Sequence, residues 1–271
     1  MKILCPMDFS EAAINGMEYA AHLAKVLSGQ LTLLYVRVSV WPEALPLEHQ
    51  AKDSSEDISI RLQEMSNEIQ FEFQVPCNYC IDCTTNTLPE AIANQAKKQD
   101  LIIMGTNGVS NSYQYIFGTN TYHVIEKTQC PLMIVPQGYV YKPIQNIVYA
   151  FEPDTNPIFL IDQLKRLVVP IKAAVRVVHV SEDEPSNEAH HKLQALREAV
   201  LARAVRDIEW NFESLFSKDI SWALDHYMKT HQADVLALSF HHRTFMEKLF
   251  KGNVVRQISM ILEYPTFVFW H

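Results

Sequence analysis

Short apolar runs alternate along the first half of the chain with segments in which apolar residues recur at helical spacing. Runs of strand length bounded by polar residues are typical of buried parallel strands. We therefore expect strands over 3–7, 31–38, 73–82, 101–104 and 132–135, with helices over 14–24, 48–69, 87–98 and 119–127 between them. Such alternation predicts an α/β fold with a parallel sheet covered on both faces.

Polar residues at the starts of two of these segments match the chemistry of helix ends. Asp8 or Ser10 can cap the first helix, and Gly29 follows its last turn. Thr87 is a candidate cap for the helix that carries Pro89 in its first turn. These positions support helices between the predicted strands.

The second half repeats the same order of apolar runs. We expect strands over 146–149, 174–180, 220–223, 235–238 and 266–269, and a long helix over 188–216. The apolar face of that helix is formed by Leu193, Leu196, Val200, Ala204 and Ile208. The whole chain is thus predicted to form two open, parallel five-stranded units with helices on both faces.

The two halves are also similar in sequence, which indicates a duplication. Residues 100–135 align without gaps over 234–269, and the alignment matches Asp, Gly and Pro positions. Residues 2–5 resemble 146–149 at a shift larger by ten residues, which places Asp8 opposite Glu152. We attribute the ten residues to a shorter first helix and loop in the second half.

Two prolines and a glycine between residues 136 and 143 interrupt regular structure. We therefore predict two domains, over 1–138 and 139–271.

Composition and charge exclude several classes of function. The chain has 271 residues and a net charge of −8, with no run of Lys or Arg. Binding to nucleic acid needs clustered cations, so we expect no nucleic-acid partner. No segment approaches the roughly 18 uninterrupted apolar residues of a membrane helix, and the N-terminus is a poor signal peptide. Five cysteines, an odd number, suggest reduced thiols. We expect a cytoplasmic protein without a membrane partner.

Three of the seven glycines fall in one window between a predicted strand and a predicted helix, as Gly105-x2-Gly108-x9-Gly118-Thr119. Glycine lets backbone amides approach an anion, and a helix N-terminus favours phosphate. The P-loop and dinucleotide fingerprints are absent. The pattern predicts a phosphate site, and structural turn residues are the alternative.

Residues 5–10 (CPMDFS) after the first strand, residues 33–36 (LLYV) at the second and the glycine pattern together resemble the universal stress protein family. These motifs frame nearly all of residues 1–136, and the second half resembles a degenerate copy. The resemblance implies an adenine nucleotide alpha hydrolase-like, Rossmann-like fold. It also implies that the last strands of the two halves, 132–135 and 266–269, pair in an intrachain pseudo-dimer.

The family's glycine pattern marks members that bind ATP, so the resemblance implies a site for ATP, ADP or AMP, with Mg²⁺ or Mn²⁺ as a candidate accompanying cation. By position, the residues that would hold the phosphates are Gly105, Gly108, Gly118, Thr119 and Asn120. Asp8 would lie near the ribose and adenine, Val36 would contact the base through its backbone, and Met104 would flank the nucleotide. Tyr35 stands where the family often has histidine.

In the second half this pattern is lost. Ser239, His242 and Asn253 replace Gly105, Gly108 and Thr119, and only Gly252 remains. We therefore expect no nucleotide there. The alternative at this position is a lone anion near the cations Arg243, Lys248 and Lys251.

Other chemistry-bearing residues favour structural roles. On a strand, Cys77 and Cys83 share one face and Cys80 points to the other, so we interpret them as packing side chains rather than metal ligands. The adjacent pairs His190-His191 and His241-His242 diverge in any regular element, so we expect no shared metal.

The leading hypothesis is an ATP-binding regulator of the stress-response type, with an unknown protein partner. No residue is committed as a general base for a water, so we expect no dedicated catalysis. The alternatives are a nucleotide-free interaction scaffold and a slow ATP hydrolase. The sequence leaves open whether the chain assembles into a further homodimer.

Overall fold

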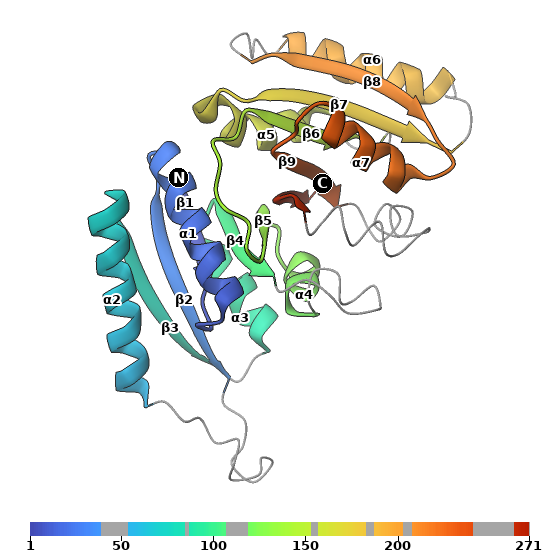
Figure 1. The fold of residues 1–271 in the computed structure, drawn as a ribbon. Coiled ribbons are helices and arrows are strands. Elements are labelled where there is room, and N and C mark those ends of the chain that lie inside the picture. The colour runs from blue at the N-terminus through green and yellow to red at the C-terminus, as the bar shows by residue number, and fades with distance from the viewer. Residues whose placement is uncertain are drawn as a thin grey trace.

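The computed structural model describes residues 1–38, 54–84, 87–106, 119–152, 157–182, 187–202, 208–240 and 263–270. Within these residues ten strands form one continuous sheet, in the order β3-β2-β1-β4-β5-β10-β9-β6-β7-β8. The first five strands in the sequence make one half of the sheet and the last five make the other, and the two halves lie side by side (Figure 1).

The first half has the predicted α/β order. Its strands are β1 (Lys2–Pro6), β2 (Gln30–Val38), β3 (Cys77–Thr84), β4 (Leu101–Thr106) and β5 (Leu132–Pro136), and all neighbouring pairs among them are parallel. Its helices are α1 (Glu11–Val26), α2 (Ser55–Phe73), α3 (Leu88–Ala96) and α4 (Thr119–Lys127). Because α2 extends to Phe73, the third strand starts at Cys77 and not at Phe73 as predicted.

Side-chain caps fix where the first-half helices begin. The Ser10 hydroxyl accepts a hydrogen bond from the Ala13 N–H at 3.2 Å, so of the two candidate caps Ser10 starts α1. Ser54 and Asp57 form a capping box at α2, and Thr87 and Glu90 form another at α3. The predicted cap at Thr87 is confirmed.

The second half has the strands β6 (Asn146–Ala150), β7 (Ala174–Ser181), β8 (Trp210–Phe216), β9 (Val235–Phe240) and β10 (Thr266–Trp270), and the helices α5 (Pro157–Ile171), α6 (Asn187–Ala202) and α7 (Ile220–Thr230). Two predictions here are wrong. Residues 210–216 form a strand instead of the end of a long helix, and 220–223 begin a helix instead of a strand, because the Asp219 carboxylate accepts the Trp222 N–H at 2.9 Å and caps it.

The duplication is visible in matching backbone contacts. The Met7 N–H donates to the Leu34 carbonyl at 2.8 Å, and the Phe151 N–H donates to the Val178 carbonyl at 2.8 Å. Both the donor and the acceptor of the second bond lie 144 positions after those of the first. The first and second strands keep this shift in both halves. A shorter first helix is therefore the wrong explanation of the ten-residue difference, which arises between the second and third strands.

The two halves join through their last strands. β10 pairs antiparallel with β5, with Phe267 opposite Met133 and Val268 opposite Leu132. This is the predicted pseudo-dimer contact, and it removes two edges that would otherwise be free to pair with other chains.

Each face of the sheet carries one apolar core. Helices α1, α2, α5 and α6 contribute to the core on one face, and α3, α4 and α7 to the core on the other. Among the described residues no helix is long and apolar enough to cross a membrane.

After β5 the chain turns at Gly138, whose φ of +76° is easily reached only by glycine. It then runs along α1, where the Asn15 side-chain amide donates to the Tyr139 carbonyl at 2.9 Å. A domain division at residue 138 stays a prediction.

Candidate functional site

A cavity of about 280 Å³ opens at the carboxyl ends of β1, β2 and β4. Helix α1 leaves β1 toward one face of the sheet, whereas α3 reaches β4 along the other. The strand order thus reverses direction between β1 and β4, and ligands of open α/β sheets bind at such a switch point. Five predicted site residues line this cavity: Asp8, Val36, Met104, Gly105 and Asn120.

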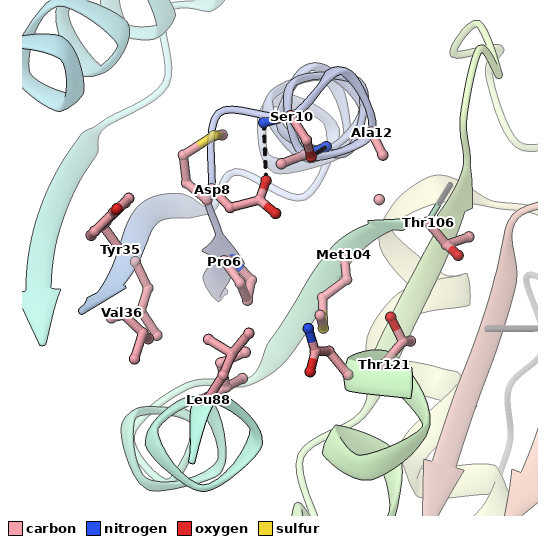
Figure 2. A pocket seen from close by; sticks show the side chains of 16 residues that line it. Pro6, Asp8, Ser10, Ala12, Tyr35, Val36, Leu88, Met104, Thr106 and Thr121 are labelled. Atoms are coloured by element: carbon pink, nitrogen blue, oxygen red, sulfur yellow. Dashed lines mark hydrogen bonds between the residues drawn. The ribbon is translucent and has the colours of Figure 1, made fainter. Parts of the chain in front are cut away.

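Asp8 lies on the tight turn between β1 and α1. Its carboxylate accepts the Ser10 N–H at 3.0 Å, and Phe9 between them has a φ of +63°. Figure 2 shows the Asp8 carboxylate directed into the pocket from the side of α1. The side chain is exposed, so it offers a charged acceptor to a ligand without the cost of a buried, unpaired charge.

Apolar side chains form the wall and floor of the cavity. Val36 comes from β2, Leu88 and Ile92 come from α3, and Met104 comes from β4. In Figure 2, Val36 and Leu88 lie together on the side opposite Asp8. A slot with an apolar wall and a carboxylate at its rim suits a flat heteroaromatic ring joined to hydroxyl groups.

Gly105 lies where α1 crosses β4 in direct contact with its backbone. A Cβ at residue 105 would be 1.7 Å from the Ala12 carbonyl oxygen, and a Cβ at Gly16 would be 2.5 Å from the Gly105 nitrogen. The glycine predicted to approach a phosphate is therefore also needed so that α1 can lie on the strand. This close approach brings Ala12 and Ala13, in the first turn of α1, to the cavity.

The remaining predicted phosphate contacts are only partly described. Asn120 and the buried Thr121, from the first turn of α4, line the cavity, and α4 begins at Thr119 as predicted. Gly108 and Gly118 lie outside the described residues. The N-terminus of α4 thus points its dipole toward the end of the pocket where a phosphate is predicted.

Several lining residues were not predicted as site residues. They are Pro6, Met7, Ser10, Ala12, Ala13, Leu34, Tyr35, Leu88, Ile92, Thr106 and Thr121. A signal exists for Thr106, which follows Gly105 at the end of the strand, and for Leu88, in the first turn of α3. Pro6, Met7, Ser10, Leu34 and Tyr35 lie within the two motifs that carry the family resemblance. For Ala12, Ala13, Ile92 and Thr121, only the position of their helix in the fold brings them to the cavity.

In the second half, larger buried side chains stand beside the position that corresponds to Gly105. Tyr149 stands where Cys5 does in β1, and its hydroxyl is 3.1 Å from the hydroxyl of Ser239, the counterpart of Gly105. The Tyr149 ring lies 5.7 Å from the ring of Phe269, and both side chains are fully buried. His179 corresponds to Tyr35, so the second half has the histidine that the family often carries at this position. Its Nδ1 lies 3.1 Å from the Phe151 carbonyl oxygen.

The other counterparts in the second half lie outside the described residues. These are His242, Gly252 and Asn253, together with the cations Arg243, Lys248 and Lys251.

The cysteines of β3 face both sides of the sheet, as the strand spacing predicts. Cys77 lies in the core beneath α2, whereas Cys80 packs against the core on the other face. Among the described residues no three His, Cys, Asp or Glu side chains are grouped as metal ligands. The rings of His190 and His191 are 6.5 Å apart on α6, and both residues are exposed. His241 and His242 lie outside the described residues.

A family model, that of the universal stress protein family, matches residues 1–136. The chain belongs to the universal stress protein family. A universal stress protein from Methanocaldococcus jannaschii is 28% identical over 141 residues, which are 49% of this chain and 81% of that protein.

Solved structures extend the similarity to the whole chain. A universal stress protein from Archaeoglobus fulgidus superposes with a TM-score of 0.72 at 17% identity, over 100% of this chain and 96% of its own. The cytoplasmic domain of a prokaryotic cation chloride cotransporter has a TM-score of 0.53 at 12% identity, over 98% and 94% of the two chains. At these identities the likeness is one of fold alone, and this fold occurs in proteins with different names and roles.

Proposed function

We propose that this universal stress protein is a regulator that binds one adenine nucleotide, ATP or a related form, in its first half. The observation that carries the proposal is that Asp8, Val36, Met104, Gly105 and Asn120, which are far apart in sequence, line one cavity. The family resemblance implies the same five residues from the sequence alone.

The polarity of the cavity supports one orientation of the ligand. The base would lie against Val36, Leu88 and Ile92, with the ribose hydroxyls toward the Asp8 carboxylate. The phosphates would extend toward Gly105 and the first turn of α4, where free N–H groups and the helix dipole favour negative charge. Asn120 would supply a side-chain donor there.

The second half would bind no nucleotide. Ser239 carries a side chain where Gly105 has none, and its hydroxyl lies 3.1 Å from the Tyr149 hydroxyl. A phosphate therefore could not approach the backbone at residue 239 as closely as it could at Gly105.

Purified protein can be tested for the nucleotide directly. Heat or acid extraction should release adenine nucleotide, and ATP added to stripped protein should raise the melting temperature of the first half. At a hundredfold excess over Kd the stabilisation is about 2.7 kcal/mol. A folded sample that releases no nucleotide, and whose melting temperature ATP does not change, would favour the nucleotide-free scaffold.

Phosphate release from bound ATP separates the regulator from a slow hydrolase. We expect ATP to be recovered intact after hours of incubation, with or without Mg²⁺ or Mn²⁺. Steady release of phosphate that is lost in Asp8→Asn, while ATP still binds, would assign hydrolysis to this site. A cytoplasmic location stays a prediction from the sequence.

A further inference from the structure

The duplication creates two equivalent grooves between the halves. They lie at the amino-terminal ends of the strands, whereas the nucleotide cavity lies at the carboxyl ends. In each groove the aspartate that precedes the fourth strand receives a hydrogen bond from the start of the first strand. Asp100 accepts the Lys2 N–H at 2.8 Å, and Asp234 accepts the Asn146 N–H at 2.9 Å. Asp234 lies beside α1 and Asp100 beside α5, so we call these the α1 groove and the α5 groove.

The chain's own linker lies along the α1 groove, and a cavity of about 440 Å³ remains between it and α1. Tyr139 and Tyr141 pack against Tyr19 of α1, with ring centroids 6.1 and 5.3 Å apart, and Tyr19 is 1% exposed. The His22 ring is stacked on Tyr141 at 4.5 Å with parallel planes. Burial and the neighbouring charge of Asp234 raise the pKa of Tyr139 to about 12.

The α5 groove has no such cover among the described residues. By the shift of 144, Gln163 corresponds to Tyr19 and Arg166 to His22. Both line a cavity of about 480 Å³ that also contains Asp100, Cys130 and Pro131. Within the described residues, the Gln163 side-chain oxygen is buried without a hydrogen-bond partner. A buried acceptor of this kind is usually satisfied by a donor from protein or from ordered water, so Gln163 offers an acceptor to a ligand in the groove.

The charges around the α5 groove are mainly positive, although the chain as a whole carries −8. Lys97, Lys127 and Arg166 line it, with Asp100 as the carboxylate. Lys127 is paired with Glu90 at 3.0 Å, and Lys97 donates to Asn94 at 2.9 Å. Among the described residues Arg166 has no partner. Its exposed guanidinium can stack on an aromatic ring as His22 does on Tyr141.

We propose that the α5 groove binds an extended, acidic segment of a partner protein, which places an aromatic side chain on Arg166 and donates a backbone N–H to Gln163. The equivalent groove shows the kind of occupant, because a tyrosine-containing segment of this chain without regular secondary structure already lies there. The cations determine its charge. The proposal does not depend on nucleotide binding in the first half.

Fluorescence anisotropy with a labelled peptide, Glu-Gly-Tyr-Val-Tyr-Glu, tests the proposal on the full chain. Its central residues copy Gly138–Tyr141, and acidic ends replace the native neighbours. We expect saturable binding that Arg166→Glu weakens about tenfold or more, because the substitution removes the stacking partner and reverses its charge. Arg197→Glu, on the exposed face of α6, is the matched control and should leave binding unchanged.

Two further peptides distinguish the competing explanations. A lysine-ended version, Lys-Gly-Tyr-Val-Tyr-Lys, and a version without rings, Glu-Gly-Ala-Val-Ala-Glu, should both bind much more weakly. Equal binding of the lysine-ended peptide, or equal effects of the two arginine variants, would overturn the proposal. The peptide without rings can also be challenged with inorganic phosphate at about 10 mM. If this peptide binds as tightly as the one with tyrosines and phosphate displaces it, the groove is a simple anion-binding patch and the proposal fails.

Discussion

Replacing Gly105 by alanine tests whether the glycine supports helix packing as well as the nucleotide. The added Cβ would lie 1.7 Å from the Ala12 carbonyl oxygen, and real Cβ atoms keep at least 3.0 Å from such a neighbour. Helix α1 or β4 would have to move by the difference, about 1.3 Å, since a backbone atom cannot rotate away. Overpacking costs about 1–3 kcal/mol, and we expect the upper part of that range, about 2–3 kcal/mol.

Differential scanning fluorimetry measures this loss through the melting temperature. At roughly 2–4 °C per kcal/mol for a chain of roughly this size, Gly105→Ala should melt about 4–12 °C below the wild type. Gly138→Ala is the control, because Gly138 has a φ of +76° and no atom within 4 Å of an added Cβ. It should lose about 1 kcal/mol through backbone strain alone. The reasoning is refuted if Gly105→Ala melts no lower than Gly138→Ala.

Three further predictions address the site, the thiols and one ion pair. Asp8→Asn keeps an acceptor for the Ser10 N–H but removes the charge, so it should weaken ATP binding about tenfold in a calorimetric titration, whereas Glu152→Gln at the equivalent position of the second half should not. Equal effects of these two substitutions would contradict the assignment of the site. In a DTNB assay at pH 8 the exposed Cys83 should react quickly, whereas the half-buried Cys130, whose pKa burial and Asp100 raise to about 12, should react much more slowly because little of it is thiolate; equal rates for the two cysteines would contradict this prediction. The Lys127 hydrogen bond, with contacts from Thr87, lowers the pKa of Glu90 from 4.5 to about 2. The contribution of this ion pair to the stability of the fold is therefore present above pH 4.5 and is lost as the pH falls toward 2. The difference in melting temperature between the wild type and Glu90→Gln should shrink over that range. A constant difference would contradict the ion pair.

The first half of the fold was largely predictable because each of its segments carries its own signal. Apolar runs predict its strands, and Ser10 and Thr87 cap helices where the polar pattern places them. The second half misled the prediction where local signals conflict. Ile208 continues the helical apolar spacing of α6 but lies outside that helix, immediately before β8, and the cap at Asp219 turns an apolar run of strand length into a helix.

The site was predictable where it rests on a motif and not where it rests on tertiary approach. Asp8 and Gly105 belong to the motif, so the sequence indicates both. Ile92 reaches the cavity only because α3 crosses the sheet beside β2, a packing that no short pattern encodes. In the same way, the contact of Gly105 with Ala12 depends on how closely α1 approaches β4.

Isothermal titration calorimetry of nucleotide-free protein with ATP tests the asymmetry between the halves most directly. The cavity beside Asp8 and the replacement of Gly105 by Ser239 in the second half together predict one ATP per chain. A stoichiometry of two would contradict the loss of the site in the second half, and no binding would contradict the site in the first.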